Sequence, residues 1–253
     1  MIGLYHTIQT GKGVFIHPSA SIGQHVTIYD GVRIGANSVI GDYCTIGEPL
    51  HSFYTQENYI QSPTIIGANS LIRSHSIIYA GNQMDDYFST GHRVTIRENN
   101  RFASHNSIGT LSDIQGESVF GSYVRLHSSV HICQGSTLGN YVMIYPFVVF
   151  MNDRYPPTTH TKGPTVGDYT QVGVQSVLHS GVRIGENSLI GAQSSVHKDL
   201  APFSFFSGNP GALIGDVRTI KDEMGNPLYP WPYRFDRGMP WSELGYDRWK
   251  EEK

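Results

Sequence analysis

Two amide side chains, Gln134 and Asn152, have a type and spacing that suggest chemistry. They stand eighteen positions apart, and Asn152 opens a proline-containing segment. An amide oxygen accepts a hydrogen bond from a neutral amine and thereby orients the lone pair of the amine nitrogen. We therefore predict that Gln134 and Asn152 are catalytic residues that hold an amine. The alternative is that the two amides only hydrogen bond to each other.

Histidine is the second candidate, because a neutral imidazole can act as a general base near pH 7. Three of the 12 histidines, His92, His127 and His131, fall in the middle of the chain, and we take His127 as the candidate base. A zinc site shared across subunits needs two histidines in phase, whereas His92 and His127 are 35 positions apart, one short of twice eighteen. Cys44 and Cys133 stand alone. We therefore expect no catalytic metal.

A six-residue repeat must position these side chains. Apolar residues recur at every sixth position over residues 16–46, 66–150 and 166–196, with Thr90 as the one polar member, and glycine often follows directly. Neither a helical nor a strand period explains this spacing. A solenoid with three short flat sides per coil does, because each apolar residue then points inward. The repeat predicts an all-β parallel β-helix with about eighteen residues per coil and coils about 4.8 Å apart.

The eighteen-residue coil sorts the corners of the solenoid into three columns. One column is mostly bare, being Gly67, Asp85, Ala103, Gly121, Gly139, Gly167 and Gly185. A second column contains Arg73, Gly91, Gly109, His127, Tyr145, Gly173 and Gly191. The third contains Ala80, Glu98, Gly116, Gln134 and Asn152, so the two amides are expected to stack on adjacent coils.

Two interruptions of the repeat, at residues 47–65 and 151–165, contain prolines and predict loops that leave the solenoid at a corner. We predict that residues 1–200 form the catalytic β-helix domain and that residues 201–253 form an extension packed on it. Within the extension, residues 217–223 predict a short helix that ends at Gly225. The following segment, 227–235, is rich in proline and aromatic residues and is expected to lie against the solenoid or to cap its open end.

Composition excludes several classes of function. A net charge of −3 and a charged fraction of 15% give no basic surface for nucleic acid. No run approaches the roughly 20 apolar residues of a membrane span, and no signal peptide is recognised at the N-terminus. The two isolated cysteines fit a reducing compartment, so a cytoplasmic protein is expected.

Several segments resemble one subgroup of the hexapeptide-repeat acyltransferases, which are left-handed parallel β-helices. They are residues 90–99, 109–116, 124–132 and 152–157, together with the tail 229–241. Residues 207–212 resemble the closing Gly-x-Pro-Ala element of the family, with Gly211 where alanine usually stands. The subgroup consists of the N-acetyltransferases that act on dTDP-3-amino-3,6-dideoxyhexoses, and the resemblance covers nearly the whole chain.

This resemblance implies a cytoplasmic homotrimer of bacterial surface-polysaccharide biosynthesis, in which acetyl-CoA and the dTDP-amino sugar meet between neighbouring subunits. It also implies that the departing coenzyme A sulfur receives the proton while Asn152 holds the amine. Gln134 stands where some relatives have an acidic residue. The implied substrate-binding residues are His92, Arg97, Glu98 and Asp153. The implied residues for acetyl-CoA are Gly173, Gly191, Ala192, Gly208 and Pro210.

Other functions remain open at this point. Within the acyltransferases, the acceptor can be a 4-amino nucleotide sugar, or a hydroxyl group in an O-acetyltransferase. A γ-type carbonic anhydrase has the same fold, but the spacing of His92 and His127 disfavours its zinc site. A structural or ice-binding solenoid would show an array of threonines on one side, and here threonine is scattered.

Overall fold

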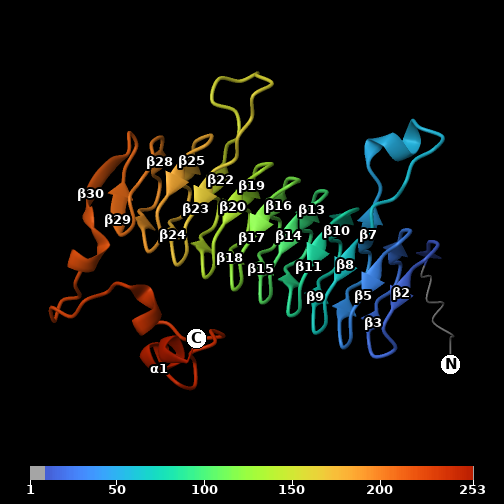
Figure 1. Cartoon of the computed structure of the whole chain (residues 1–253), viewed down its shortest axis with the longest axis horizontal. Helices are drawn as coiled ribbons and strands as arrows, with labels where there is room; N and C mark the ends of the chain where they lie inside the picture. Colours follow the sequence, from blue (N-terminus) through green and yellow to red (C-terminus); the bar gives the residue numbers. More distant parts are fainter. Residues whose placement is uncertain (1–8, 253) are drawn as a thin grey trace.

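The computed structural model describes residues 9–252, which form a three-sided solenoid of short strands followed by an extension that folds back along it (Figure 1). The first eight residues of the predicted 1–200 domain lie outside the described part. Each coil contributes one strand to each of three sheets, here called A, B and C, and nearly all strand pairs are parallel. The structure confirms the predicted left-handed parallel β-helix with two loops and a C-terminal extension.

The strands follow one another from sheet A to B to C in every coil. Sheet A contains β1 (Gln9–Thr10), β4 (Thr27–Ile28), β7 (Thr45–Glu48), β10 (Ile77–Tyr79), β13 (Thr95–Ile96), β16 (Asp113–Ile114), β19 (His131–Ile132), β22 (Val149–Phe150), β25 (Val177–Leu178) and β28 (Ser195–Val196). Sheet B contains β2 (Phe15–Ile16), β5 (Arg33–Ile34), β8 (Ile65–Ile66), β11 (Gln83–Met84), β14 (Arg101–Phe102), β17 (Val119–Phe120), β20 (Thr137–Leu138), β23 (Thr165–Val166) and β26 (Arg183–Ile184). Sheet C contains β3 (Ser21–Ile22), β6 (Val39–Ile40), β9 (Leu71–Ile72), β12 (Ser89–Thr90), β15 (Ser107–Ile108), β18 (Arg125–Leu126), β21 (Met143–Ile144), β24 (Gln171–Val172), β27 (Leu189–Ile190), β29 (Ser204–Ser207) and β30 (Ala212–Asp216).

The core is the column of inward residues that the repeat predicted. In a two-residue strand the second side chain points inward, and these side chains are almost completely buried, as with Ile114 and Ile132. Thr90 is the polar residue in this apolar column. It is tolerated there because its hydroxyl accepts a hydrogen bond from the backbone N–H of Arg73 at 3.0 Å. The polar group is therefore satisfied inside the core. The first residue of each strand points outward, so the side chains that can contact a ligand are at those positions and at the corners.

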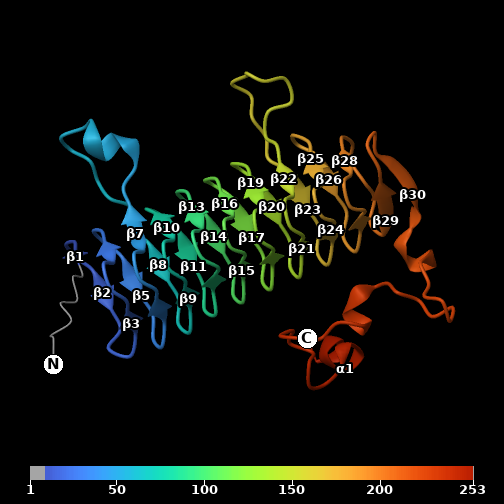
Figure 2. The same cartoon turned by 180° about the vertical axis from the view of Figure 1, so that it is seen from behind.

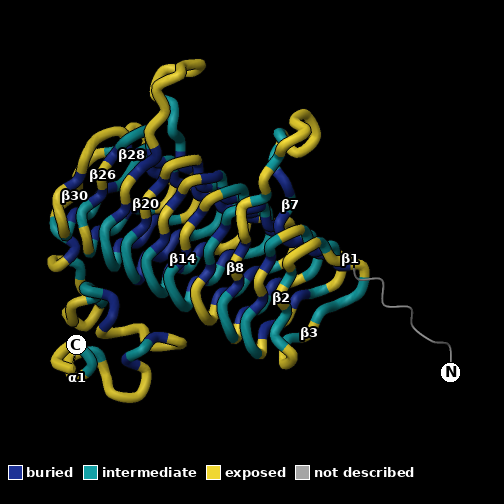
Figure 3. Tube along the Cα trace, turned by 45° about the vertical axis from the view of Figure 1, so that its right-hand side comes forward, coloured by how far each residue is buried: buried dark blue, intermediate teal, exposed yellow. Residues whose placement is uncertain are grey.

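Both loops leave the solenoid at the same edge, where sheet A turns into sheet B (Figures 1 and 3). The first loop follows β7 and contains a short 3-10 helix, η1 (His51–Tyr54). The second loop follows β22, and a hydrogen bond of 2.7 Å from Lys162 N to Asn152 O closes its base. The loops are five coils apart, one following β7 and the other β22, so they stand at either end of one stretch of this edge.

Aromatic rings form a column at the edge between sheets B and C. Tyr87, His105, Tyr123, Tyr141 and Tyr169 occupy the left-handed corner position of successive coils, with φ near 60°. Their rings stack with centroid distances of 4.5, 4.4, 5.2 and 4.8 Å. At its C-terminal end the column forms an apolar cluster with Met143, an outward residue of sheet C.

The C-terminal extension contributes to that cluster. After β29, strand β30 turns back antiparallel and covers the edge of sheet C, and the chain then returns along sheet C (Figures 1 and 2). Trp231 donates its indole N–H to Tyr169 O at 2.7 Å, and Trp241 is only 1% exposed. The aromatic part of this segment therefore lies against the solenoid.

The helix predicted over 217–223 is wrong. Only a single 3-10 turn forms there, η2 (Val217–Thr219), capped by the Asp216 carboxylate. Lys221 then forms a bridge with Pro227 instead of continuing a helix. The regular helix of the extension is α1 (Tyr246–Glu251), and a further 3-10 turn is η3 (Trp231–Tyr233). η3 and α1 contact the aromatic column through Trp231, Tyr246 and Trp249, whereas Val217 of η2 hydrogen bonds to Phe203 O.

Replacing Trp241 by alanine tests this docking. Trp241→Ala removes a buried indole from the cluster with Tyr141 and Met239, so it should cost about 3–5 kcal/mol of local packing. We expect limited proteolysis to cleave within 217–252 much faster than in the wild type. The control is Met224→Ala in the same segment, because Met224 is 84% exposed. Equal cleavage rates in the wild type and Trp241→Ala would contradict the docking.

Candidate functional site

Gln134 and Asn152 lie where the repeat predicted, at the edge between sheets A and B, which we call the A–B edge. The structure does not pair them with each other. Gln134 donates from Nε2 to the Glu117 carboxylate at 3.0 Å, which leaves its amide oxygen available as an acceptor. The Asn152 backbone O accepts from Lys162 N and from Ser180 Oγ at 2.8 Å. Within residues 9–252 no hydrogen bond involves the Asn152 side chain, so two amide acceptors are open at the base of the second loop.

Arg97 and Glu98 lie on the same edge, two coils before Gln134. Arg97 Nε and Nη2 contact the Glu98 carboxylate at 2.8 and 3.2 Å, and the guanidinium lies over the Tyr79 ring. The next corner has Gly116, where an added Cβ would lie 3.3 Å from the Glu98 side chain. The Arg97–Glu98 pair therefore fills the space above Gly116. A role for Arg97 and Glu98 in substrate binding stays a prediction.

Asp153 organises the second loop. Its carboxylate accepts from the backbone N–H of Tyr155 at 3.0 Å and of Thr158 at 2.7 Å, and from the Thr158 hydroxyl. These hydrogen bonds, those from Thr158 N above all, lower the pKa of Asp153 from its ordinary value. Asp153 is thus occupied in shaping the loop beside Asn152, and direct contact with a substrate stays a prediction.

A histidine–carboxylate pair that the sequence did not reveal lies on the outward face of sheet A. His131 Nδ1 lies 3.1 Å from Asp113 Oδ2, and Gln115 donates to the same oxygen at 2.8 Å. The hydrogen bond from His131 is the main reason that the pKa of Asp113 is lowered, with smaller contributions from Gln115 and Arg97 against a burial effect that raises it. An imidazole held through Nδ1 presents Nε2 outward. The sequence feature that indicates this pair is the spacing of eighteen residues between Asp113 and His131, both at outward strand positions.

His127 lies at a different edge from the two amides. It occupies the turn from sheet C to sheet A, the C–A edge, and stacks on Tyr145 with ring centroids 4.9 Å apart. Burial and then the positive charge of Arg125 lower the pKa of His127, which favours the neutral imidazole. The full width of sheet A separates His127 from Gln134. A single chain therefore does not bring the candidate base and the amides together.

His92 also lies at the C–A edge, two coils before His127 and shifted by one corner position. Its Nδ1 is 2.9 Å from Ser74 Oγ on the preceding coil. The two histidines are out of phase, as their sequence spacing indicated. In the described part of the chain, no three side chains of His, Cys, Asp or Glu gather closely enough to hold a metal ion.

The residues predicted for acetyl-CoA gather at the C-terminal end of the C–A edge. A hollow there is lined by Gln175, Ala192, Gln193, Gly208 and Asn209. Gly173 and Gly191 line up on the same edge, where a Cβ would come within 2.7 Å of Ala192 N and 2.4 Å of Ser207 Oγ. Close stacking of the coils therefore demands glycine at both positions. Binding of a cofactor along this bare edge stays a prediction.

No helix in the described part of the chain combines the length and the apolar character that crossing a membrane requires. The sequence matches the family model described as bacterial transferase hexapeptide (six repeats) over residues 7–48 and 163–198. It is 25% identical over 89% of its length to the acyl-[acyl-carrier-protein]–UDP-N-acetylglucosamine O-acyltransferase of Campylobacter concisus, of which it covers 75%. It is 27% identical over 77% of its length to the bifunctional protein GlmU of Alkaliphilus oremlandii, but spans only 39% of that protein.

Among solved structures, the chain resembles a mutant of GDP-perosamine N-acetyltransferase from Caulobacter crescentus in complex with CoA and GDP-perosamine. The identity is 16%, the TM-score is 0.23, and the match covers 82% of this chain and 58% of the other. A similarity this low carries no argument about the site.

The Asp113–His131 pair predicts a specific dependence of stability on pH. Because the pKa of Asp113 is lowered in the folded protein, its contribution is present above the ordinary carboxyl pKa of about 3.9 and is lost as the pH falls through the lowered value. Asp113→Asn should therefore show a shallower fall in Tm between about pH 5 and pH 3 than the wild type. Asp85→Asn, at an exposed corner, is the control. Parallel curves for Asp113→Asn and the wild type would contradict the pairing.

Proposed function

We propose that the chain is an acyltransferase of the hexapeptide-repeat kind, and that it transfers an acetyl group from acetyl-CoA to the amino group of a dTDP-linked 3-amino-3,6-dideoxyhexose. The observation that carries this proposal is the pair of open amide acceptors, Gln134 and Asn152, at the base of the second loop. A neutral amine is already a nucleophile and needs acceptors that orient it, whereas a hydroxyl needs a base. The A–B edge offers acceptors of this kind.

The donor is proposed to lie along the C–A edge. The hollow at Ala192 and Gly208 takes the nucleotide end of acetyl-CoA, and the arm runs over Gly191 and Gly173 toward Tyr145 and His127. Three coils separate Gly191 from His127, which is about 14 Å at the spacing of neighbouring strands. An extended thioester arm spans such a distance, and no side chain stands at Gly173 or Gly191 to block it.

The C–A edge, proposed to bind the donor, and the A–B edge, which has the two amides, lie on opposite sides of sheet A. Within one subunit the two halves of the proposed site are therefore apart. We propose that the protein is a homotrimer in which the C–A edge of one subunit faces the A–B edge of its neighbour. Closed rotational symmetry presents the same two edges at every interface. The thioester and the amine then meet between subunits.

In the proposed reaction the amine nitrogen attacks the thioester carbonyl carbon, forming the C–N bond, and the carbon–sulfur bond breaks. Gln134 and Asn152 accept N–H hydrogens and aim the lone pair at the carbonyl carbon. A backbone N–H of the solenoid stabilises the oxyanion. The proton leaving nitrogen goes to the departing sulfur, which yields free coenzyme A thiol. His127, held neutral beside Arg125, packs against the donor without taking the proton.

O-acylation of a sugar hydroxyl is the second candidate. The Asp113–His131 pair favours it, because an imidazole oriented by a carboxylate can remove a proton from a hydroxyl. The relative from Campylobacter concisus is named as an O-acyltransferase. Comparing an amino sugar nucleotide with its hydroxyl counterpart as acceptor decides between the two candidates.

Removing either amide should slow transfer without unfolding the protein. We expect Asn152→Ala and Gln134→Ala each to lower kcat by about 10- to 1000-fold, because each removes one orienting contact on the amine. His127→Ala should have a milder effect, and its pH–rate profile should still report the amine. The readout is release of coenzyme A thiol. An inactive His127→Ala enzyme beside nearly normal Asn152→Ala and Gln134→Ala enzymes would overturn the assignment and make histidine the base.

Light scattering checks the assembly. A homotrimer is expected at assay concentration, since the proposed site takes one edge from each of two subunits. A monomer that is fully active in N-acetyl transfer would contradict the shared site.

A further inference from the structure

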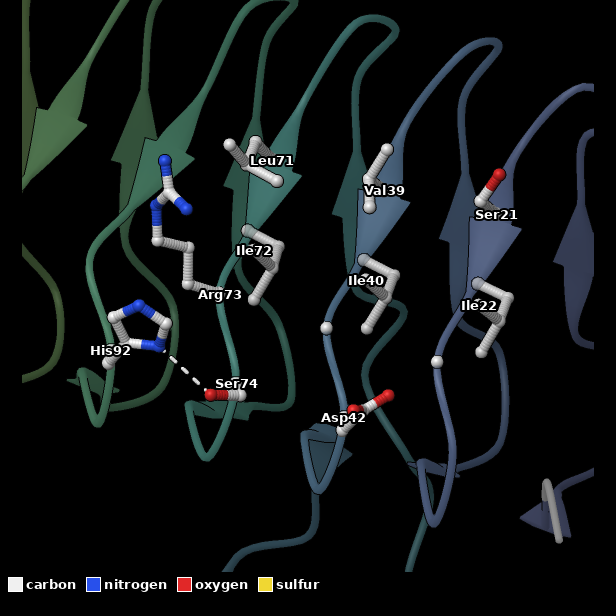
Figure 4. Close-up of a pocket in the computed structure, with 12 residues that line it drawn as sticks. Ser21, Ile22, Val39, Ile40, Asp42, Leu71, Ile72, Arg73, Ser74 and His92 are labelled. Atoms are coloured by element: carbon white, nitrogen blue, oxygen red, sulfur yellow. Dashed lines mark hydrogen bonds between the residues drawn. The ribbon is translucent and has the colours of Figure 1, made fainter. Parts of the chain in front are cut away.

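An open groove lies on the N-terminal half of sheet C, beside the C–A edge (Figure 4). Val39 and Leu71 form its floor on the outward face of neighbouring strands, and Arg73, His92 and Asp42 stand along its margin. Val39 is 42% exposed although it is apolar. Farther along the same face, the C-terminal extension contacts Arg125 and Met143, whereas within residues 9–252 it makes no such contact with the groove residues.

The margin of the groove has cationic groups that nothing in residues 9–252 neutralises. Among residues 9–252, no ion pair or hydrogen bond involves the guanidinium of Arg73, and the same holds for Arg93, next to His92. Other arginines find carboxylates, as Arg97 and Arg218 do. An exposed arginine at the end of an apolar groove matches a ligand with one flat apolar part and one anionic part, and a guanidinium pairs best with a phosphate or carboxylate.

The groove is aligned with the proposed site of transfer. Arg73 and His127 occupy the same corner column, and the two residues between them in that column are Gly91 and Gly109. Three coils separate Arg73 from His127, which is about 14 Å. The two corner positions between the groove and His127 therefore have no side chain. The groove lies on the N-terminal side of His127, and the proposed donor approaches His127 from the C-terminal side.

We propose that this groove binds the pyrimidine nucleoside diphosphate of the acceptor sugar, an inference that rests on the proposed function. Arg73 contacts the diphosphate, and Val39 and Leu71 pack against the base and deoxyribose. Asp42, one coil farther from His127, accepts a hydrogen bond from a nucleoside hydroxyl or N–H, while its Oδ1 also accepts from Gln24 N at 2.7 Å. A carboxylate repels phosphate, so Asp42 marks the nucleoside end of the groove and Arg73 the phosphate end. The sugar then points along Gly91 and Gly109 toward His127.

Titration calorimetry with dTDP as the probe tests the subsite without any turnover. Arg73→Ala should weaken dTDP binding by about 10- to 100-fold, the loss expected for a charge-assisted contact with phosphate. The matched control is Arg183→Ala, an exposed arginine on the outward face of sheet B, which should bind dTDP as the wild type does. Acetyl-CoA binding should be unchanged in both variants. With the sugar nucleotide as substrate, Arg73→Ala should raise KM and leave kcat nearly unchanged.

Three results would overturn the subsite. The first is an equal dTDP affinity in Arg73→Ala and the wild type, and the second is a wild type that does not bind dTDP. The third is a Val39→Glu variant that dissociates into monomers in light scattering but binds dTDP as tightly as the wild type. The last result would show that a second copy of the chain covers the groove. The proposed function is judged separately, by coenzyme A release with a nucleotide-free amino sugar at high concentration. If coenzyme A is released with this nucleotide-free acceptor while dTDP does not bind, the proposed subsite is wrong and the proposed N-acetyl transfer is retained.

Discussion

The hydrogen-bonded stacking of one coil on the next is the constraint on which the rest of this structure depends. Corner N–H groups reach carbonyls on the neighbouring coil, as Gly135 N does to Gly116 O and Glu117 N to Glu98 O, or a side-chain oxygen there, as Ala68 N does to Asp86 Oδ1, so the coils cannot slide past one another. Inward positions must be apolar or internally satisfied, which leaves only outward strand positions and corners for chemistry. Groups that act together must then share a column or face each other between subunits.

This constraint explains why the candidate residues are divided between two edges. The A–B edge offers hydrogen-bond acceptors and both loops, whereas the C–A edge offers bare glycine corners, a neutral histidine and an unpaired arginine. Each set is incomplete for the proposed transfer, because the amide acceptors need a thioester nearby and the bound donor needs an amine. The width of sheet A prevents one chain from joining them. The proposed trimer brings the two edges together between neighbouring subunits.

The strict period made the solenoid, its columns and its loops predictable from sequence. Gln134 and Asn152 were placed on adjacent coils of one edge because the count of eighteen survives up to the loop that begins after Asn152. The Asp113–His131 pair obeys the same count, but both residues are outward strand positions, which the apolar period does not mark. The extension could not be predicted in the same way. Its segment 217–223 has no period, and α1 forms where Tyr246 and Trp249 meet the aromatic column, a contact between residues far apart in the chain.

Release of coenzyme A thiol by the purified protein, measured across a panel of acceptors and donors, tests the central claim most directly. The account predicts release that requires both acetyl-CoA and a dTDP-linked 3-amino-3,6-dideoxyhexose, together with a product whose mass shows one added acetyl group on nitrogen. Release only with a hydroxyl acceptor, or transfer only from an acyl carrier protein, would contradict it.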